Sequence, residues 1–258
     1  MRPVASPPRP WAERPTSPVQ PAQLEIHYQP IADVQGGGIV GAEALLRRRM
    51  PSGVVQIAAR FLPLAEATGL LVEIGRRVID RACGQAAMWQ AFRRGSWVTV
   101  NLSSRQLADP ALVDWVEAVL TRHALRPDLL VFDIPEYVVA ESALDGGPRL
   151  QHMRELADLG VRIAVDDAGT GAPAPSYLPF VPVSMLKIDG RVVRGDSPLL
   201  PELVALGQQR ELIVLAEGVE QEEQLAQVTE LGVDLVQGYA IGRATSPDRI
   251  AQTLRTWA

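Results

Sequence analysis

Short apolar runs recur along this chain, and most of them end in a carboxylate, an amide or a lysine. Apolar runs bounded by turn residues are typical of buried parallel strands. The stretches between the runs show helical spacing instead. Residues 71–92, for example, place on one helical stripe Ile74, Val78, Ile79, Ala82, Ala86 and Trp89. The pattern therefore predicts buried strands that alternate with amphipathic helices.

The alternation continues over about 230 residues, which predicts an α/β fold of the closed, TIM-type (β/α) barrel. Residues 23–258 suffice for one barrel and leave no room for a second domain of ordinary size. Residues 1–22 hold seven of the 21 prolines and no apolar periodicity, so we expect a disordered, Pro-rich leader. Active sites of such barrels lie at the C-terminal ends of the strands, so the polar strand ends predict a site there.

Composition and charge exclude several classes of protein. No stretch is apolar for long enough to span a membrane, and the leader lacks the apolar core of a signal peptide, so we expect a cytoplasmic protein without membrane contact. A net charge of −5, without a basic stripe of interleaved aromatics, argues against binding to a DNA or RNA polymer. The basic cluster from Arg47 to Arg49 directly follows a predicted strand end and would suit a single phosphate. Cys83 cannot form an internal disulfide and is expected in the core.

The chain has one lysine, Lys187, against 24 arginines. Because arginine is used in place of lysine everywhere else in the chain, this position is expected to need a compact ammonium where a planar guanidinium would not fit. Lys187 is therefore the first residue expected to take part in chemistry. The histidines His27, His123 and His152 fall at no metal-ligand spacing, which argues against a zinc site.

Oxygen ligands, by contrast, are plentiful at the predicted strand ends. They are Glu43, Asn101, Asp133, Asp166, Asp167, Asp189 and Glu217. Several carboxylates that point into one barrel mouth repel each other unless a hard cation neutralises them. Oxygen-only ligands predict Mg²⁺ or Mn²⁺. The adjacent Asp166 and Asp167 could hold a pair of ions at the roughly 3.5–4 Å spacing of two-metal phosphoryl chemistry.

These positions belong to an ordered set of motifs. In chain order they are Tyr-Gln-Pro-Ile (28–31), Glu-Ala-Leu-Leu-Arg (43–47), Asn-Leu-Ser (101–103), Asp-Ile-Pro-Glu (133–136), Asp-Asp-Ala-Gly-Thr-Gly (166–171), Leu-Lys-Ile-Asp (186–189), Ala-Glu-Gly-Val-Glu (216–220) and Gln-Gly-Tyr (237–239). The set resembles the EAL domain family over residues 24 to about 247. The resemblance implies a (β/α)8 barrel with an antiparallel first strand. It also implies a phosphodiesterase that hydrolyses cyclic di-GMP to linear pGpG with two Mg²⁺ or Mn²⁺ ions.

The resemblance further implies a role for each matching residue. Metal ligands would be Glu43, Asn101, Asp133 and Asp166 for one ion, Asp166 and Asp167 for the second, with Asp189 supporting the second. Glu217 would hold an ion-bound water, and Lys187 and Gln237 would orient the attacking water or hydroxide. Arg47 would bind a phosphate oxygen and Gln29 a guanine edge, while Glu136 and Glu220 would brace the loop after the two aspartates.

Several positions depart from the family pattern. Asp133 stands where the family has glutamate and is one methylene shorter, in a kind of site that tolerates misplacement of about 0.5 Å. Pro135 replaces a threonine, Ala168 a phenylalanine and Ala244 a proline. Residues 172–175 read Ala-Pro-Ala-Pro in place of Tyr-Ser-Ser-Leu. The loop is therefore expected to lose an aromatic anchor and its hydroxyls.

Three functions are compatible with these residues. The first is a working cyclic di-GMP phosphodiesterase. The second is a degenerate barrel that binds cyclic di-GMP, or a protein partner, without cleavage. The third lies outside the family and is a Schiff-base aldolase with Lys187 as its nucleophile. A homodimer and a protein partner that supplies the signal are left open by the sequence.

Overall fold

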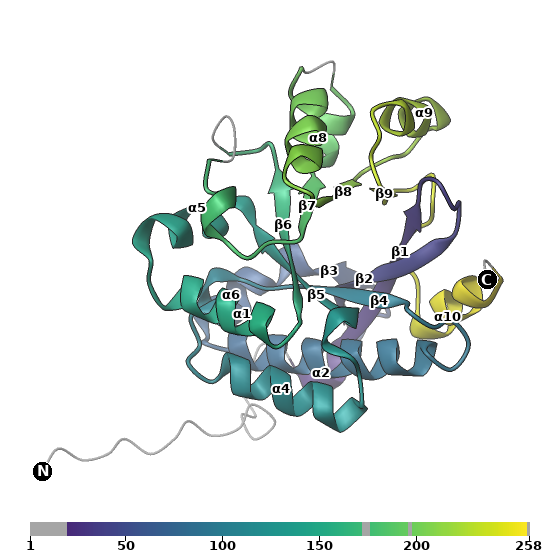
Figure 1. The fold of residues 1–258 in the computed structure, drawn as a ribbon. Helices are drawn as coiled ribbons and strands as arrows, with labels where there is room; N and C mark the ends of the chain where they lie inside the picture. Colours follow the sequence, from purple (N-terminus) through teal and green to yellow (C-terminus); the bar gives the residue numbers. More distant parts are fainter. Residues whose placement is uncertain (1–19, 172–175, 196–197, 257–258) are drawn as a thin grey trace, which may run out of the picture.

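A closed barrel of strands forms the centre of the computed structural model, which describes residues 20–171, 176–195 and 198–256 (Figure 1). The barrel strands are β1 (Leu24–Asp33), β2 (Ile39–Arg49), β4 (Trp97–Asn101), β5 (Leu130–Pro135), β6 (Arg162–Ala168), β7 (Met185–Ile188), β8 (Ile213–Ala216) and β9 (Leu235–Val236). They pair in the order β1-β9-β8-β7-β6-β5-β4-β2, and the pairing of β1 with β2 closes the ring. β1 runs antiparallel to both neighbours, and the other barrel pairs are parallel. The predicted barrel with an antiparallel first strand is confirmed.

The antiparallel first strand follows from a short connection. A turn at residues 34–38 joins β1 to β2, and Gly37 adopts a left-handed φ of 64° within it. A connection this short permits only an antiparallel pair, whereas parallel strands need a crossover of a dozen or more residues. Glycine adopts the left-handed conformation without the steric cost that a Cβ would bring.

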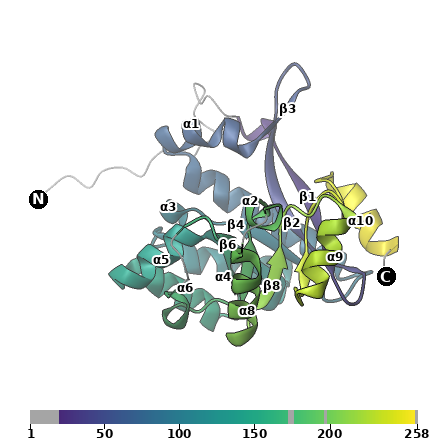
Figure 2. The ribbon, with the colours of Figure 1, turned by 90° about the horizontal axis from the view of Figure 1, so that it is seen from above.

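Strand β2 is longer than its apolar run. The apolar run predicted a strand that ends near Glu43, with Arg47 to Arg49 after it, and this boundary is wrong because β2 continues to Arg49. β1 pairs with β2 as far as Arg48, and the short β3 (Val55–Ile57) pairs with its last three residues. Backbone partners on both sides extend the ladder beyond the apolar residues. β3 and the short α1 (Leu62–Ala67) lie together beyond the rim of the barrel (Figure 2).

Helices surround the strands. The longer ones are α2 (Leu71–Trp89), α4 (Leu112–His123), α5 (Glu136–Asp145), α6 (Pro148–Asp158), α8 (Leu199–Gln209), α9 (Glu222–Glu230) and α10 (Pro247–Thr256). Short helices follow the strand ends as α3 (Ser104–Leu107) and α7 (Gly190–Val193), and 3-10 turns occupy Pro21–Gln23, Ala58–Arg60, Pro127–Leu129 and Leu178–Phe180. None of the helices in the described ranges is long and apolar enough to cross a membrane.

Helix α2 buries the stripe that its spacing predicts, from Ile74 to Trp89. Trp89 meets Tyr28 of β1 edge to face, with ring centroids 5.5 Å apart. Side chains alternate along a strand, so the side chain of Gln29 points to the barrel interior because that of its neighbour Tyr28 points outward. Cys83 on the same helix is fully buried, as expected, and burial raises the pKa of its thiol to about 12.

Two predicted features fall on parts of the chain outside the described residues. Of the leader predicted over residues 1–22, residues 1–19 lie outside the described residues, and the leader stays a prediction. The altered loop segment 172–175 lies entirely outside the described residues.

Candidate functional site

The predicted site residues gather at one rim of the barrel because parallel strands end there. In the strand register Gln29 lies opposite Glu43, Asn101 opposite Asp133, and Pro135 opposite Asp166. The remaining strand ends contribute Lys187 from β7, Glu217 after β8 and Gln237 after β9. The structure therefore places these residues on consecutive strands around one mouth.

Lys187 is the centre of this rim and is fully buried. Its Nζ lies 2.9 Å from Asp133 Oδ2, 2.9 Å from Asp166 Oδ1 and 2.7 Å from Glu217 Oε1. Burial alone would lower the pKa of Lys187, but these carboxylates outweigh it and hold that pKa well above its usual value. A Schiff-base nucleophile must be a neutral amine. The ammonium is therefore a fixed point charge, which counts against the aldolase interpretation.

The carboxylates around Lys187 carry more negative charge than one ammonium neutralises. Burial, together with the charges of Asp166 and Glu43, raises the pKa of Asp133 to about 7 and that of Glu217 to about 8. Burial and the neighbouring Asp166 raise the pKa of Asp167 to about 6. Lys187 opposes each of these shifts without cancelling them. Such a surplus of buried negative charge is what a hard cation would relieve.

These raised values predict a pH dependence of stability in chelator. Between about pH 4.5 and 8, the folded protein keeps protons on Asp133 and Glu217 that the unfolded chain has released. The unfolded state then binds fewer protons, so stability must fall as the pH rises through this window. Each kcal/mol shifts the Tm of a chain of this size by about 2–4 °C. In EDTA we expect a Tm several degrees lower at the upper end of the window than at its lower end.

Calorimetric Tm values across the window would check this, with Glu217→Gln as the matched variant. Removing one titrating group should flatten the slope, and added Mn²⁺ should reverse it because a cation favours the ionised carboxylates. A metal-free Tm that rises steadily with pH would contradict the assignment of protons to these buried groups.

The donor set fits a divalent ion. One carboxylate oxygen from each of Asp166, Asp167 and Glu217 lies within 4.8 Å of the others. Asn101 donates its Nδ2–H to Glu43 Oε1 at 2.7 Å, which leaves its carbonyl oxygen as a ligand atom. Asp133 Oδ1 is buried and has no hydrogen-bond partner among the described residues. All of these atoms are the hard oxygen ligands that Mg²⁺ and Mn²⁺ prefer.

Asp166 and Asp167 face the same mouth through an irregularity in β6. Adjacent strand residues normally point to opposite faces of a sheet. Here the register with β7 shifts between Val165 and Ala168, and Asp167 has a left-handed φ of 57°. This conformation is uncommon for a residue with a Cβ, although aspartate adopts it more readily than most residues do. The shift brings both carboxylates to one ion position.

Asp189 lies beside this pair and is held by Arg191, which donates Nε–H to Oδ1 at 2.9 Å and Nη2–H to Oδ2 at 3.0 Å. The side-chain hydrogen bond from Arg191 keeps the pKa of Asp189 below its usual value. Arg191 was not singled out from the sequence. The sequence feature that could have indicated this contact is the position of Arg191 two residues after Asp189, which caps the N-terminus of α7.

A second polar group centres on Glu43. Gln237 donates Nε2–H to Glu43 Oε2 at 2.7 Å, while its own Oε1 is buried without a partner in the described part of the chain. Gly238 is required after it, because a Cβ there would lie 2.0 Å from the Val219 carbonyl oxygen. Glu43 is therefore oriented by two amide donors, Asn101 and Gln237. Neither Glu43 nor Asp133 belongs to the tight group of Asp166, Asp167 and Glu217.

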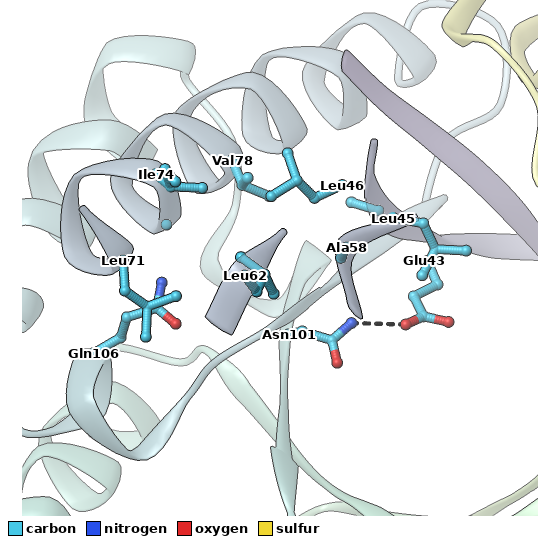
Figure 3. A pocket seen from close by; sticks show the side chains of 12 residues that line it. Glu43, Leu45, Leu46, Ala58, Leu62, Leu71, Ile74, Val78, Asn101 and Gln106 are labelled. Carbon is cyan, nitrogen blue, oxygen red and sulfur yellow. Dashed lines mark hydrogen bonds between the residues drawn. The ribbon is translucent and has the colours of Figure 1, made fainter. Parts of the chain in front are cut away.

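Two hollows border the polar group formed by Glu43, Asn101 and Gln237. One, of about 220 Å³, is lined by Gln29, Glu217, Gln237 and Tyr239 among others. The other, of about 250 Å³, has the hydrogen-bonded Glu43 and Asn101 at one end and apolar side chains of α2 at the other (Figure 3). Arg47 lies farther along β2, half-buried, with Nη1 bonded to the Leu46 carbonyl at 3.0 Å. The predicted base and phosphate residues thus lie on the strands that border the mouth.

The loop after the two aspartates is held by Glu136. Its Oε2 accepts the backbone N–H groups of Gly169 and Gly171, each at 3.2 Å, and its Oε1 accepts the Tyr177 hydroxyl at 3.2 Å. Tyr177 is a partner that the sequence did not reveal. Glu220 instead pairs with Arg194 at 3.5 Å. The two glutamates predicted to brace this loop therefore make different contacts.

Comparisons with known proteins agree with this geometry. A family model described as EAL domain matches residues 17–244. The chain is 38% identical over 235 residues to the bifunctional diguanylate cyclase/cyclic di-GMP phosphodiesterase MucR of Pseudomonas aeruginosa, covering 88% of this chain and 34% of that protein. The chain spans about a third of the length of the curated relatives it matches.

Solved structures show the same fold. One described as the PaMucR phosphodiesterase in a c-di-GMP complex superposes with a TM-score of 0.83 at 37% identity, covering 89% of this chain and 94% of that one. The FimX EAL domain from Pseudomonas aeruginosa bound to c-di-GMP superposes with a TM-score of 0.79 at 28% identity, covering 87% of this chain and 91% of that one.

Proposed function

This chain belongs to the EAL domain family, and we propose that it hydrolyses cyclic di-GMP to linear pGpG with the help of divalent metal ions. The observation that carries the proposal is the buried ammonium of Lys187 within 2.9 Å of carboxylates from three strand ends. Its relative MucR carries cyclic di-GMP phosphodiesterase in its name, and the PaMucR structure holds c-di-GMP.

The ligands for the ions would be Glu43, Asn101, Asp133, Asp166 and Asp167, with Asp189 in support. A bound Mg²⁺ or Mn²⁺ would lower the pKa of a water bound to it and would neutralise negative charge on the phosphate. Lys187 and Gln237 would orient the attacking water, beside which Lys187 would place a positive charge, and Glu217 would hold an ion-bound water. The positive charge also stabilises the negative charge that grows on phosphorus oxygens in the transition state.

Substrate recognition uses the residues that flank the metal ligands. Gln29 can hydrogen-bond a guanine edge with an amide that now donates to the Gly242 carbonyl at 3.2 Å. Arg47, on the same strand as Glu43, can bind a phosphate oxygen with a charge-assisted bond.

One observation favours a second candidate, a receptor that binds cyclic di-GMP without cleaving it. Asp133 is one methylene shorter than the family's glutamate, and its carboxylate is not part of the tight group of Asp166, Asp167 and Glu217. An ion held without Asp133 would be poorly positioned, so it would orient the nucleotide poorly and would activate water poorly.

Steady-state assays with labelled cyclic di-GMP and Mn²⁺ test the proposal by following both retention and pGpG formation. We expect pGpG from the parent protein and none from Glu43→Gln, which removes one ligand oxygen without changing size. Retention of nucleotide without pGpG would establish the receptor instead. The cytoplasmic location, the homodimer and the signalling partner stay predictions.

A further inference from the structure

We infer that Thr99 is a positioning residue for the metal site, because its hydroxyl fixes the carboxylate of Asp133 so that one oxygen is presented to the ion. The inference rests on the proposed function in that it takes Asp133 as a metal ligand. Thr99 lies on β4, two residues before Asn101, and belongs to none of the family motifs.

Thr99 and Asp133 meet inside the barrel. Both side chains are fully buried, and Thr99 Oγ1 donates to Asp133 Oδ2 at 2.7 Å. In the register of β4 and β5, Asn101 lies opposite Asp133 and Thr99 opposite Val131. Since side chains two apart share a face, Thr99 occupies the layer directly below Asn101 and reaches Asp133 diagonally.

The two oxygens of Asp133 have different surroundings. Oδ2 accepts two bonds, from Thr99 at 2.7 Å and from Lys187 Nζ at 2.9 Å. Oδ1 is buried and has no hydrogen-bond partner in the described ranges. Rotation of the carboxylate would break both bonds to Oδ2, and a buried hydroxyl left unpaired is costly. The pair of donors thus locks the side chain with Oδ1 as its open ligand atom.

The hydroxyl also suits the short side chain. The carboxylate of an aspartate lies one methylene closer to its own strand than that of a glutamate, at the depth that Thr99 reaches. A threonine on a strand has a restricted χ1, so its hydroxyl is held in place at little entropic cost. Hydrogen-bond partners of ligating carboxylates typically contribute about 10- to 100-fold in metal affinity. Thr99 therefore compensates for the departure at position 133.

The test measures Mn²⁺ binding to the nucleotide-free protein by calorimetry. Thr99→Val removes the hydroxyl and keeps the shape, so we expect its Kd for Mn²⁺ to rise by about 10-fold or more. Thr99→Ser keeps the hydroxyl and should stay close to the parent. Thr121→Val on the exposed face of α4 is the matched control and should change nothing. Tm values in EDTA confirm that each variant folds.

A double-mutant cycle keeps the inference testable if Thr99→Val is poorly folded. Asp133→Glu moves the carboxylate away from the hydroxyl, so Thr99→Ala should weaken Mn²⁺ binding in the parent and leave it unchanged in the Asp133→Glu background. Equal losses of Mn²⁺ affinity in both backgrounds would overturn the inference. Parent-like affinity in Thr99→Val, or a loss in Thr99→Ser as large as that in Thr99→Val, would also overturn it.

A parent that binds no Mn²⁺ overturns both this inference and the proposed function. A parent that binds Mn²⁺ with the predicted Thr99 dependence, yet forms no pGpG, refutes only the hydrolysis.

Discussion

Chelation of divalent ions is expected to abolish hydrolysis of cyclic di-GMP, and added Mn²⁺ or Mg²⁺ should restore it. The physical reason is the group of buried carboxylates at the barrel mouth, where burial and then the charges of neighbouring carboxylates raise the pKa of Asp133 to about 7 and that of Glu217 to about 8. A phosphodiester that brings further negative charge cannot enter such a site favourably without a cation. Loss of activity in EDTA should therefore be complete within the sensitivity of the assay.

Calcium is the informative control. It takes about 6–8 ligands at about 2.3–2.6 Å, whereas Mg²⁺ requires octahedral geometry at about 2.0–2.1 Å. We expect Ca²⁺ to support nucleotide retention and little turnover. Full turnover in excess chelator would contradict a metal-dependent reaction at this site.

Replacing Lys187 with arginine is expected to lower turnover by 100-fold or more, about 3 kcal/mol of transition-state stabilisation. The lysine is fully buried, and its Nζ lies within 2.9 Å of three carboxylates. Arginine keeps the charge but brings a planar fork that this space does not accommodate without displacing Asp133 or Asp166. The charge alone is therefore not sufficient.

Initial rates with saturating cyclic di-GMP and Mn²⁺ would measure this effect, with Tm values to show that the variant folds. Arg105→Lys, the opposite exchange at an exposed position on α3, is the matched control and should retain parent activity. If Lys187→Arg hydrolyses cyclic di-GMP at the parent rate, the single lysine is an accident of composition.

The barrel and most of its rim were predictable because strand ends carry their own signal. Apolar runs that stop at Glu43, Asp166 or Lys187 mark the point where buried backbone meets the mouth, and parallel pairing then gathers these ends. The length of β2 was not predictable in this way. Its last residues, through Arg49, are strand because β1 and β3 supply backbone partners, not because their side chains are apolar.

Contacts within the site were harder to predict than its members. Thr99 is chemically ordinary in a strand, and only the register of β4 and β5 shows that it reaches Asp133. Tyr177 lies 41 residues from Glu136 and has no motif to connect them. The separation of Asp133 from the tight group of Asp166, Asp167 and Glu217 depends on side-chain positions that spacing does not encode.

A single-turnover experiment tests the central claim most directly. With protein and Mn²⁺ in excess over labelled cyclic di-GMP, neither slow product release nor weak binding can account for a lack of pGpG, so the experiment observes cleavage alone. We predict conversion of all bound label to pGpG in one exponential phase. Label that remains bound as intact cyclic di-GMP, however long the incubation, would contradict the assignment of this barrel as a phosphodiesterase.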